Sequence, residues 1–453
     1  MNKANLEIDN ICAISTPQGI GGVALIRISG NKAIEIVQSI FSKEINNEAG
    51  YSIHFGSIFE NKNEIDQVLV TIFRNPHSFT GEDTVEITCH GSLFIQNKII
   101  ELLINNGARI AKAGEFSQRA FLNGKMDLSQ TEAIADLIHS SSAAAHNIAM
   151  NQMKGGFSNE LKSLREKLIS FASLVELELD FAEEDVEFAD RKQLNELVEK
   201  LVCHVNQLKN SFKYGNAIKN GVETVIVGRP NSGKSTLLNS LLNEDRALVS
   251  NIPGTTRDTI EEIININGIE FRLIDTAGVR DATDNIEKMG VERTIQKIKT
   301  SSILIYLYDA QKTKKEEVQK DIEILNQKEI PALIIANKID LLNSDNDIQN
   351  NHIKLSAKEE KDAQILKNEI HQLFLEQKVD EQGVVISNLR HFEALEMASI
   401  ELQKVKEGLE NKLSGDFLAM DIRQVLFHIG SITGDISSDE LLGNIFTNFC
   451  IGK

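Results

Sequence analysis

The feature that most constrains the fold is the stretch TVIVGRPNSGKSTLLN, an apolar run followed at once by the spacing G-x-x-x-x-G-K-[ST], from Gly228 to Ser235. Consecutive backbone N–H groups of such a loop cradle phosphates at the amino end of the following helix. Lys234 reaches the outer phosphates, and the hydroxyl of Ser235 suits Mg²⁺. The pattern predicts a strand, a phosphate-binding loop and a helix, as in a doubly wound α/β domain.

Three further motifs, DTAG, NKID and SAK, each follow an apolar run that predicts a strand. The carboxylate of DTAG can reach a metal ion, and that of NKID can accept both N–H groups of guanine. Motifs in this order, at the carboxyl ends of strands, resemble those of translation-factor-related GTPases and predict a GTP site. The predicted contacts are Asn231, Ser232, Gly233, Lys234, Ser235, Thr236, Asp275, Thr276, Ala277, Gly278, Asn337, Lys338, Ile339, Asp340, Ser356, Ala357 and Lys358.

The residues available for hydrolysis differ from those of Ras-like proteins, which place a water-orienting Gln directly after the glycine of DTAG. Here that position is Val279, so the water must be oriented from elsewhere. Arg257 and Arg280 are candidate arginine fingers, and each suits a structural salt bridge equally well. A monovalent cation bound by Asn231 and by oxygens of residues 250–255 is the other way to neutralise charge, and the residues leave these alternatives open.

The rest of the chain has two textures. Residues 1 to about 120 contain short β-rich runs (GGVALIRIS, DQVLVTIF, DTVEITCH) and one helical run near FIQNKIIELLINNG, which predict an α+β domain. From about 126 to 213, apolar residues recur at helical spacing on both sides of the acidic segment EEDVEFAD, which predicts two long amphipathic helices. Helical spacing returns after about residue 388, first through Phe392, Leu395 and Ala398 and later through Leu418, Ile422, Val425 and Ile429.

The simplest arrangement is an α/β module inserted between two parts of one helical bundle, entered through a hinge at GNAIKNG. The fold class is therefore multidomain, α+β and α/β. We expect an amino-terminal domain at 1–122, the two parts of the discontinuous helical bundle at 123–218 and 381–453, and an inserted Ras-like G domain at 219–380.

Composition restricts the partners and the compartment. There are 48 Lys and Arg against 66 Asp and Glu, a net charge of −18, so the chain has no general attraction to phosphate backbones or anionic lipid. The four cysteines form no Cys-x-x-Cys pair, which argues against a zinc knuckle or a disulfide framework. No secretory signal or membrane-length apolar run is apparent. We expect a soluble cytoplasmic protein without a membrane partner.

The carboxyl terminus reads FCIGK, with Cys450 four residues from the end. Gly452 and Lys453 do not fit a prenylation box, so lipidation is disfavoured. A buried structural cysteine and a reactive thiolate both remain open. Ser437 and Glu440 form a capping box, which predicts a last helix that starts at Ser437 and runs to the chain end.

Several blocks together closely resemble the MnmE family, also called TrmE, of bacterial tRNA-modification GTPases. They include GRPNSGKSTLLN, ALVSNIPGTTRD, DTAGVRDATDNIEKMGVER, TPQGIGGVALIRISG, SFTGEDTVEITCHG, GEFSQRAFLNGKMDL and the terminal FCIGK. The resemblance extends over essentially the whole chain, and it covers blocks outside any GTPase domain. It is therefore more specific than the phosphate-binding loop alone.

The resemblance implies a homodimer joined through amino-terminal domains that bind a tetrahydrofolate derivative, 5-formyl- or methylene-tetrahydrofolate. It also implies G domains that pair in the presence of GTP and K⁺. With an FAD-containing MnmG-type partner, in a heterotetramer, the family modifies C5 of the wobble uridine of certain tRNAs. The added group is carboxymethylaminomethyl or aminomethyl, made with a folate one-carbon unit and glycine or ammonium.

Carried over by residue, the resemblance adds the loop residues Ser250, Asn251, Ile252, Pro253, Gly254, Thr255 and Thr256 to the GTP site. It implies Ser235 and Thr256 as Mg²⁺ ligands and Asn231, Ser250, Ile252 and Thr255 as K⁺ ligands. Pro253 fixes φ and removes an N–H, which could bias movement of that loop. Glu287 matches the acidic residue that orients the attacking water. The alternative interpretation is that Glu287 is an exposed charge on a solvated helix, without a catalytic role.

For the folate, the matching positions are Arg27, Glu86, Lys125 and Lys453. A carboxylate can bind the paired donors of a pterin ring, and cations suit the glutamate tail. We further hypothesise that Cys450 takes part in, or positions, the one-carbon chemistry. The main alternative function is an RNA-binding ribosome-assembly GTPase, and a third is a membrane-associated dynamin-like GTPase.

Overall fold

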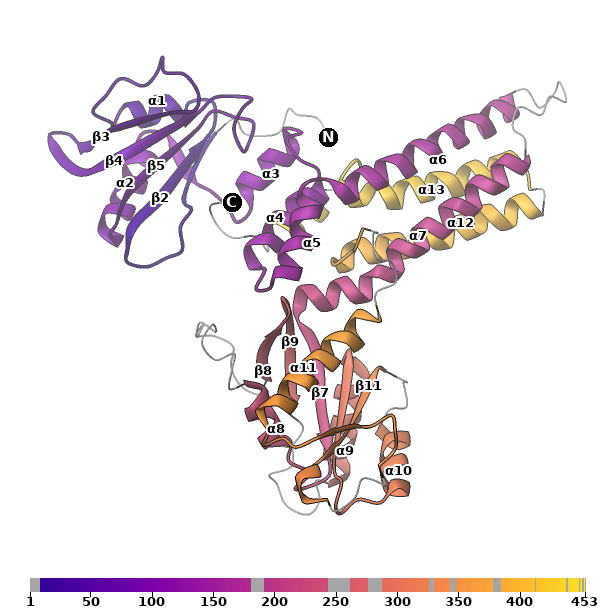
Figure 1. Ribbon diagram of the computed structural model, residues 1–453. Helices are drawn as coiled ribbons and strands as arrows, with labels where there is room; N and C mark the ends of the chain where they lie inside the picture. The colour runs from indigo at the N-terminus through magenta and orange to yellow at the C-terminus, as the bar shows by residue number, and fades with distance from the viewer. Residues whose placement is uncertain are drawn as a thin grey trace. The chain divides into compact units, whose positions relative to one another are not determined.

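The computed structural model describes residues 9–180, 191–242, 261–275, 287–325, 330–342, 348–377, 384–411, 413–436, 439–447, 449 and 452 (Figure 1). The chain divides into two compact units. The first combines Met1–Ile138, Gln152–Lys167 and Leu426–Lys453, and the second combines His139–Asn151 and Leu168–Val425. Each unit is therefore assembled from segments far apart in sequence, and the two ends of the chain belong to the same unit.

The first unit contains a six-stranded sheet in the order β3-β4-β5-β2-β1-β6. Its neighbours are antiparallel except for β1 and β6, which are parallel. The strands are β1 (Asn10–Ile14), β2 (Gly21–Ser29), β3 (Ser52–Glu60), β4 (Asn63–Phe73), β5 (Thr84–Gly91) and β6 (Ala108–Ile110). The three predicted β-rich runs are β2, β4 and β5, and the helical run is α2 (Leu93–Asn105), so the α+β prediction is confirmed.

The two faces of this sheet differ. On the inner face, alternate residues such as Ile26, Ile28 and Ile87 pack in one core with α1 (Ala33–Gln38) and α2. On the outer face, Ile11 and Ala13 pack with Phe116 of α3 (Glu115–Leu122). Arg27 is paired with Ala13 on one side and with Glu86 on the other, so both candidate folate residues lie on the outer face.

Helices α4 (Leu128–His139) and α14 (Asp439–Thr447) join the first unit through a cluster of Leu128, Leu442 and Phe446. Because α14 ends at Thr447 and Gly452 lies in a turn with φ +94°, the prediction of a helix running to the chain end is wrong. The turn places the carbonyl of Gly452 where it accepts hydrogen bonds from Ser15 and Arg27. The predicted cap Ser437 lies outside the described residues.

The second unit contains long helices from both sides of the α/β module. They are α5 (Ala143–Met153), α6 (Gly156–Asp180), α7 (Arg191–Asn220), α12 (Leu389–Glu410) and α13 (Gly415–Thr433), of which α6 and α13 continue into the first unit. Helices α7 and α12 are antiparallel neighbours: Phe212 stacks on Phe392 with ring centroids 4.6 Å apart, and Ser399 Oγ donates to Asn206 Oδ1 at 3.0 Å. The predicted discontinuous bundle is confirmed. The acidic segment between its first two long helices lies outside the described residues.

The predicted hinge at GNAIKNG is wrong, because α7 continues through it to Asn220. Gly215 is buried, and a Cβ atom there would lie 2.2 Å from the carbonyl oxygen of Ile386. This glycine serves close packing between α7 and the segment that leads into α12. The helix is ended instead by Gly221, with φ +83°.

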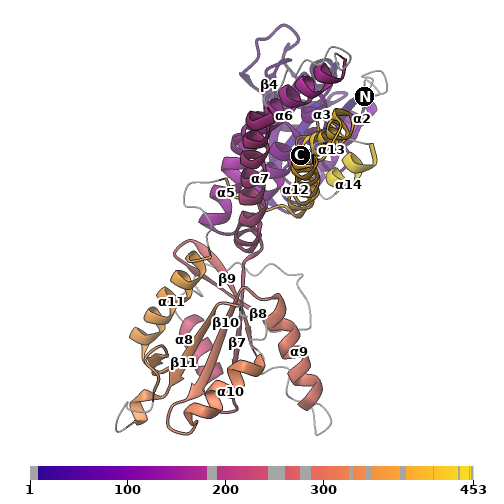
Figure 2. The ribbon, with the colours of Figure 1, turned by 90° about the vertical axis from the view of Figure 1, so that its right-hand side faces the viewer.

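The α/β module has a six-stranded sheet in the order β12-β11-β10-β7-β9-β8, parallel except for β8. Helices α8 and α11 pack on one face, and α9 and α10 pack on the other (Figure 2). The elements are β7 (Val222–Gly228), α8 (Lys234–Leu242), β8 (Glu261–Ile266), β9 (Ile269–Asp275), α9 (Glu287–Thr300), β10 (Ile303–Asp309), α10 (Lys315–Leu325), β11 (Ala332–Asn337), β12 (Ile353–Leu355) and α11 (Glu360–Leu375). This is the predicted doubly wound fold, and all four motifs follow parallel strands at one edge of the sheet.

Among the helices whose residues the structure describes, none has the length and apolar character needed to cross a membrane.

Candidate functional sites

The phosphate-binding loop lies between β7 and α8, as its motif predicts. Lys234 begins α8 with only 8% of its surface exposed, and its Nζ donates to the carbonyl oxygens of Gly228 at 2.9 Å and Arg229 at 3.2 Å. Gly233 has φ +99°, and a Cβ atom there would lie 2.3 Å from Nδ2 of Asn337. The loop therefore requires glycine both for its backbone conformation and for its contact with the NKID motif.

Asn337 joins three of the predicted motifs. Its Nδ2 donates to the carbonyl oxygen of Ser232 at 2.7 Å, and its Oδ1 accepts from the backbone N–H groups of Lys338 at 2.8 Å and Ala357 at 2.9 Å. The side chain is buried, with 1% exposed, so these bonds are shielded from water. The structure thus brings the phosphate-binding loop, NKID and SAK together at one site.

Lys338 adds a second link, from a left-handed backbone with φ +66°. Its Nζ donates to the main-chain oxygen of Asn231 and to Oδ2 of Asp309, both at 2.7 Å. The main-chain oxygen of Asn231 therefore has a hydrogen-bond partner in Lys338. Asp309 ends β10, after the apolar run SILIYLY, as Asp275 and Asn337 end their strands, so the sequence carried a signal for it that our prediction missed.

Several predicted residues lie outside the described part of the chain. They are Ser250, Asn251, Ile252, Pro253, Gly254, Thr255, Thr256, Thr276, Ala277, Gly278 and the arginine-finger candidates Arg257 and Arg280. Asp275 ends β9, and Glu287 is the first residue of α9, but the side-chain placement of Glu287 is outside the description. Ser235 and Thr236 are exposed in the first turn of α8, while Ser356, Ala357 and Lys358 follow β12.

The candidate folate residues Arg27 and Glu86 form an ion pair on neighbouring strands. Arg27 Nη2 and Nε donate to the same oxygen, Glu86 Oε1, at 2.7 Å and 2.9 Å. The guanidinium lies over the rings of Phe79 and Phe116, with its Cζ 5.5 Å and 5.7 Å from the two centroids. Such stacking and the shared oxygen hold the cation in one orientation.

The carboxyl-terminal segment meets this pair. The carbonyl oxygen of Gly452 accepts from Ser15 Oγ at 3.2 Å and from Arg27 Nη1 at 3.4 Å. Lys125 is exposed and donates to the carbonyl oxygen of Pro76 at 2.9 Å instead. The structure therefore joins Arg27 and Glu86 to Gly452, which directly precedes Lys453, while Cys450 and Lys453 themselves lie outside the described residues.

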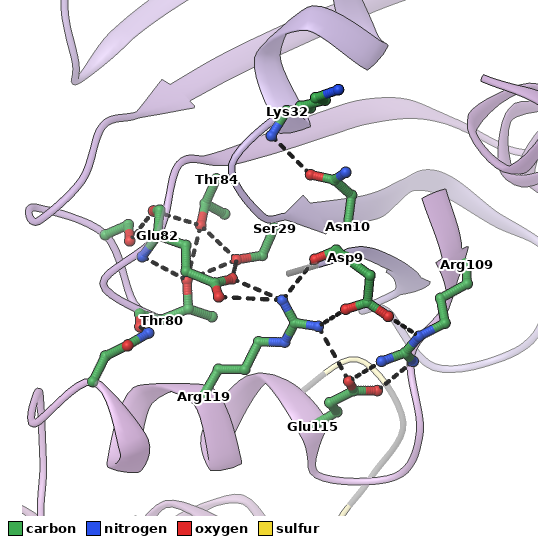
Figure 3. A network of polar contacts seen from close by, with 12 residues as sticks. Asp9, Asn10, Ser29, Lys32, Thr80, Glu82, Thr84, Arg109, Glu115 and Arg119 are labelled. Carbon is green, nitrogen blue, oxygen red and sulfur yellow. Dashed lines mark hydrogen bonds and ion pairs between the residues drawn. The ribbon is translucent and has the colours of Figure 1, made fainter. Parts of the chain in front are cut away.

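A buried ionic network supports α3 beside this site (Figure 3). The Arg119 side chain is 5% exposed, and it pairs with Asp9 at 2.5 Å, Glu82 at 3.1 Å and Glu115 at 3.3 Å. Arg109 also pairs with Asp9 and Glu115. Burial alone would raise the pKa of Glu115, but hydrogen bonds from Arg109 and the Lys112 N–H lower it to about 2. Because Phe116 follows Glu115 directly, the network positions the ring under Arg27.

Comparison with known families assigns the chain. The family model described as the MnmE helical domain matches residues 128–450, and the model of the GTP-binding protein TrmE N-terminus matches residues 10–125. The chain belongs to the MnmE family.

Relatives in the MnmE family match along nearly their whole length. The protein named tRNA modification GTPase MnmE of Flavobacterium johnsoniae is 50% identical over 462 residues, which covers 98% of this chain and 99% of the relative. The proteins of the same name from Cytophaga hutchinsonii and Bacteroides fragilis are 50% and 48% identical, again over 98% of this chain and 98% and 99% of the relatives.

Two solved structures are more distant from this MnmE-family chain. Aquifex aeolicus Era bound to GDP and AlF4⁻ is 23% identical, covers 40% of this chain and 66% of its own, and has a TM-score of 0.27. The FeoB G-domain of Methanococcus jannaschii is 22% identical, covers 34% and 98%, and has a TM-score of 0.26. At these TM-scores the two structures add nothing to the assignment.

Sequence reasoning did not find Ser15, Phe79, Phe116 or the Arg119 network of this MnmE-family chain. Their roles depend on contacts between segments distant in sequence, such as the one that joins Ser15 to Gly452. Phe79, Phe116 and Arg119 lie inside blocks that carry the family resemblance, but the local sequence gave none of them a role.

Proposed function

We propose that the chain hydrolyses GTP with the help of a bound K⁺ and Mg²⁺ and, with an FAD-containing MnmG-type partner, modifies C5 of the wobble uridine of certain tRNAs with a folate one-carbon unit. As a member of the MnmE family, it is a GTPase that takes part in tRNA modification. This assignment favours tRNA modification over the ribosome-assembly and dynamin-like alternatives. The division at 1–122, 123–218, 219–380 and 381–453 and the cytoplasmic location belong to the same proposal.

The observation that carries the GTP part is the linkage through Asn337. One buried amide is bonded to the phosphate-binding loop and to the SAK segment, and Asp340 follows three residues later in the chain. A nucleotide lying along this edge would meet loop N–H groups at its phosphates and the Asp340 carboxylate at its guanine. Ser235 and Thr256 would hold Mg²⁺.

The cation part is supported by the side chain of Asn231, whose main-chain oxygen is already bonded to Lys338. With Ser250, Ile252 and Thr255, its amide oxygen would form an oxygen site for K⁺, and Glu287 would orient the water. If the cation replaces an arginine finger, hydrolysis should be at least about tenfold faster in KCl than in NaCl.

The test is the rate of phosphate release by the full chain in the two salts, with Asn231→Ala alongside. The variant should still bind GTP but lose the difference between KCl and NaCl. Equal rates of the unmodified chain in both salts would contradict the proposal.

The folate part is supported by the Arg27–Glu86 pair. Both bonds from Arg27 use one carboxylate oxygen, Glu86 Oε1, and the other oxygen has no hydrogen-bond partner among the described residues. That oxygen suits the donors of a pterin ring, and Lys125 and Lys453 would suit the glutamate tail. Glu86→Gln should weaken binding of 5-formyltetrahydrofolate by about tenfold or more in calorimetry, because a charge-assisted bond is lost.

Glu64→Gln is the matched control, since Glu64 lies on β4 and bonds to Ser57. Equal affinity of the two variants would argue against Glu86 as a ligand.

The proposed role of Cys450 is tested by Cys450→Ser, which should abolish tRNA modification while GTP hydrolysis persists.

The proposed homodimer is supported by an apolar strip on the outer face of the first sheet. Ile53 and Phe55 of β3 are 66% and 57% exposed, and Leu69, paired with Phe55, is 43% exposed. An exposed apolar face beside the edge strand of a sheet is typical of an interface. Phe55→Lys should lower the molar mass in light scattering toward that of one chain, whereas the control Ile104→Lys, on α2, should not.

A further inference from the structure

The carboxyl-terminal segment is held by the side chains of Ser15 and Arg27. Ser15 and Arg27 both donate to the main-chain oxygen of Gly452, 437 and 425 positions further along the chain. A main-chain acceptor is independent of the side chain at that position. The contact therefore fixes the path of the backbone and not the identity of one residue.

The backbone at Gly452 also fits its place closely. Its φ is +94°, and a Cβ atom would lie 2.6 Å from the carbonyl oxygen of Ile14 and 3.1 Å from Cα of Ser15. Since both contacts are with backbone, neither can move aside cheaply. Only glycine can bring this carbonyl against β1.

Arg27 is itself held rigidly. Two of its nitrogens donate to Glu86, the guanidinium lies over two rings, and the side chain is only 14% exposed. The remaining nitrogen, Nη1, faces Gly452. The bond to the tail is made by a group that needs little further ordering, so little entropy is lost in forming it.

The same segment is held on its other side. Gly114, at the start of α3 with φ +67°, lies so close that a Cβ atom would be 2.6 Å from the carbonyl oxygen of Phe446. Phe446 also packs in the cluster with Leu128 and Leu442, and its ring lies 5.4 Å from that of Phe449. The chain therefore contacts the start of α3 at Phe446 and the end of β1 at Gly452.

We propose that Ser15 and Arg27 are positioning residues that clamp the carboxyl-terminal segment through the carbonyl of Gly452. The clamp sets the register of the tail on the amino-terminal domain, beside Glu86. It deepens the proposed function, since the neighbours of Gly452 in sequence are the proposed reactive Cys450 and folate contact Lys453. Its test requires neither folate nor tRNA.

The test is removal of the terminal lysine from the full chain by a carboxypeptidase specific for basic residues, followed by intact mass spectrometry. The carboxypeptidase can remove the lysine only when the tail has detached from the amino-terminal domain. The rate of lysine release therefore reports the equilibrium between the attached and the detached tail. Ser15→Ala and Arg27→Lys should each speed release by about fivefold, the effect of one lost hydrogen bond. Gly452→Ala should speed it more, because φ and contact are both lost.

Each variant has a matched control in the same unit. Ser57→Ala and Arg74→Lys remove side chains that bond to Glu64 and to the backbone of Glu48 instead of the tail. Gly443→Ala places a Cβ with nothing within 4 Å. Hydrogen exchange of β2 amides, unchanged from the parent, shows for each variant that the sheet is intact. Release at the parent rate in all three clamp variants would overturn the proposal.

A separate titration with 5-formyltetrahydrofolate distinguishes this proposal from the folate site. If the clamp variants release lysine faster while the unmodified chain binds no folate, the clamp stands and the folate proposal fails. If folate binds but the clamp variants behave as their controls do, the folate site stands and the clamp is refuted. In tRNA modification assays, Ser15→Ala should lower the modification rate at unchanged GTP hydrolysis.

Discussion

The nucleotide site and the Arg27 site are built in opposite ways. The first uses short motifs, each continuous in sequence, that the parallel sheet brings to one edge. The second joins Arg27 to partners 59 and 425 positions away. A site made of local motifs can be read from one sequence, whereas a site made by tertiary contact cannot.

The two sites are also stabilised by different forces. The nucleotide site is held by a neutral buried amide, Asn337, by glycine backbone geometry at Gly233, and by one ion pair, between Lys338 and Asp309. The Arg27 site rests on α3, which is held by buried charges around Arg119. We therefore expect the first site to be sensitive to geometry and hydrogen-bond pattern, and the second to be sensitive to charge and pH.

The largest effect should come from Asp340→Asn, which tests the local-motif half of the comparison. The Asn side chain offers one acceptor and one donor, whereas guanine presents two N–H groups. One guanine N–H would therefore face the amide N–H of Asn without an acceptor. GTP affinity should fall on the order of 10³- to 10⁴-fold, and xanthosine triphosphate should bind better than GTP. Competition against a fluorescent nucleotide measures both, with Asp416→Asn, in the exposed first turn of α13, as control.

Retained guanine preference in Asp340→Asn would mean that contacts outside the four motifs select the base. The nucleotide site would then resemble the Arg27 site in its dependence on distant residues.

The next effect should come from Arg119→Ala, which tests the buried charges. It leaves the carboxylates of Asp9, Glu82 and Glu115 without their shared cation, although Arg109 still pairs with two of them. Removing one partner of a buried ion pair costs about 3 kcal/mol. Hydrogen exchange of β1 and β2 amides should show this loss in the first unit. Arg74→Ala, which loses a 3.9 Å ion pair with Asp83 and two exposed bonds to backbone oxygens, should change less.

A loss below about 1 kcal/mol would show that water replaces the guanidinium, as at a surface pair. The network would then be no more than an exposed ion cluster.

A comparable loss of stability in the first unit is expected at acidic pH. Burial raises the pKa of Glu115, but bonds from Arg109 and Lys112 lower it from 4.5 to about 2. A carboxylate with a lowered folded-state pKa stabilises the fold above its unfolded pKa, and that contribution is lost as the pH falls toward 2. The stability of the first unit should decline by up to about 3 kcal/mol between pH 4.5 and 2.

Glu115→Gln, compared with Glu64→Gln, should remove most of this slope in urea unfolding monitored by exchange of β1. A slope that persists in Glu115→Gln would assign the acid sensitivity to other carboxylates, such as Asp9.

These contrasts explain how much of the molecule could be predicted. Periodicity located β2, β4, β5, α2 and the long helices, because apolar spacing follows directly from which face is buried. It failed at GNAIKNG, where two glycines suggested a hinge, because the close approach of Ile386 to Gly215 is a tertiary fact. The four nucleotide motifs were readable because each carries its own chemistry. Arg27 and Glu86 were identified only through resemblance, and Ser15 not at all, because their chemistry depends on what the chain brings beside them.

The smallest effect should come from Arg229→Ala, the counterpart of Arg119 in the second unit. Arg229 pairs with Asp321 at 2.7 Å and with Glu317 at 3.0 Å, within the range of the Arg119 distances. However, its side chain is 38% exposed and that of Glu317 is 44% exposed, so water screens the pair and replaces it when the arginine is removed. Asp321 also keeps its bond from the Tyr306 hydroxyl at 2.5 Å.

The free energy of opening, measured by hydrogen exchange of β10 amides, should therefore fall by no more than about 1 kcal/mol in Arg229→Ala. The difference from the unmodified chain should shrink as salt is added. Arg119→Ala should lose about three times as much and respond less to salt, because the Arg119 and Glu115 side chains are only 5% and 9% exposed. Equal losses at both arginines would refute the argument that burial, and not bond length, separates the two networks. The short bonds of Arg229 would then be as stabilising as the buried ones of Arg119, and the contrast between a charge-dependent first unit and a geometry-dependent second unit would fail with it.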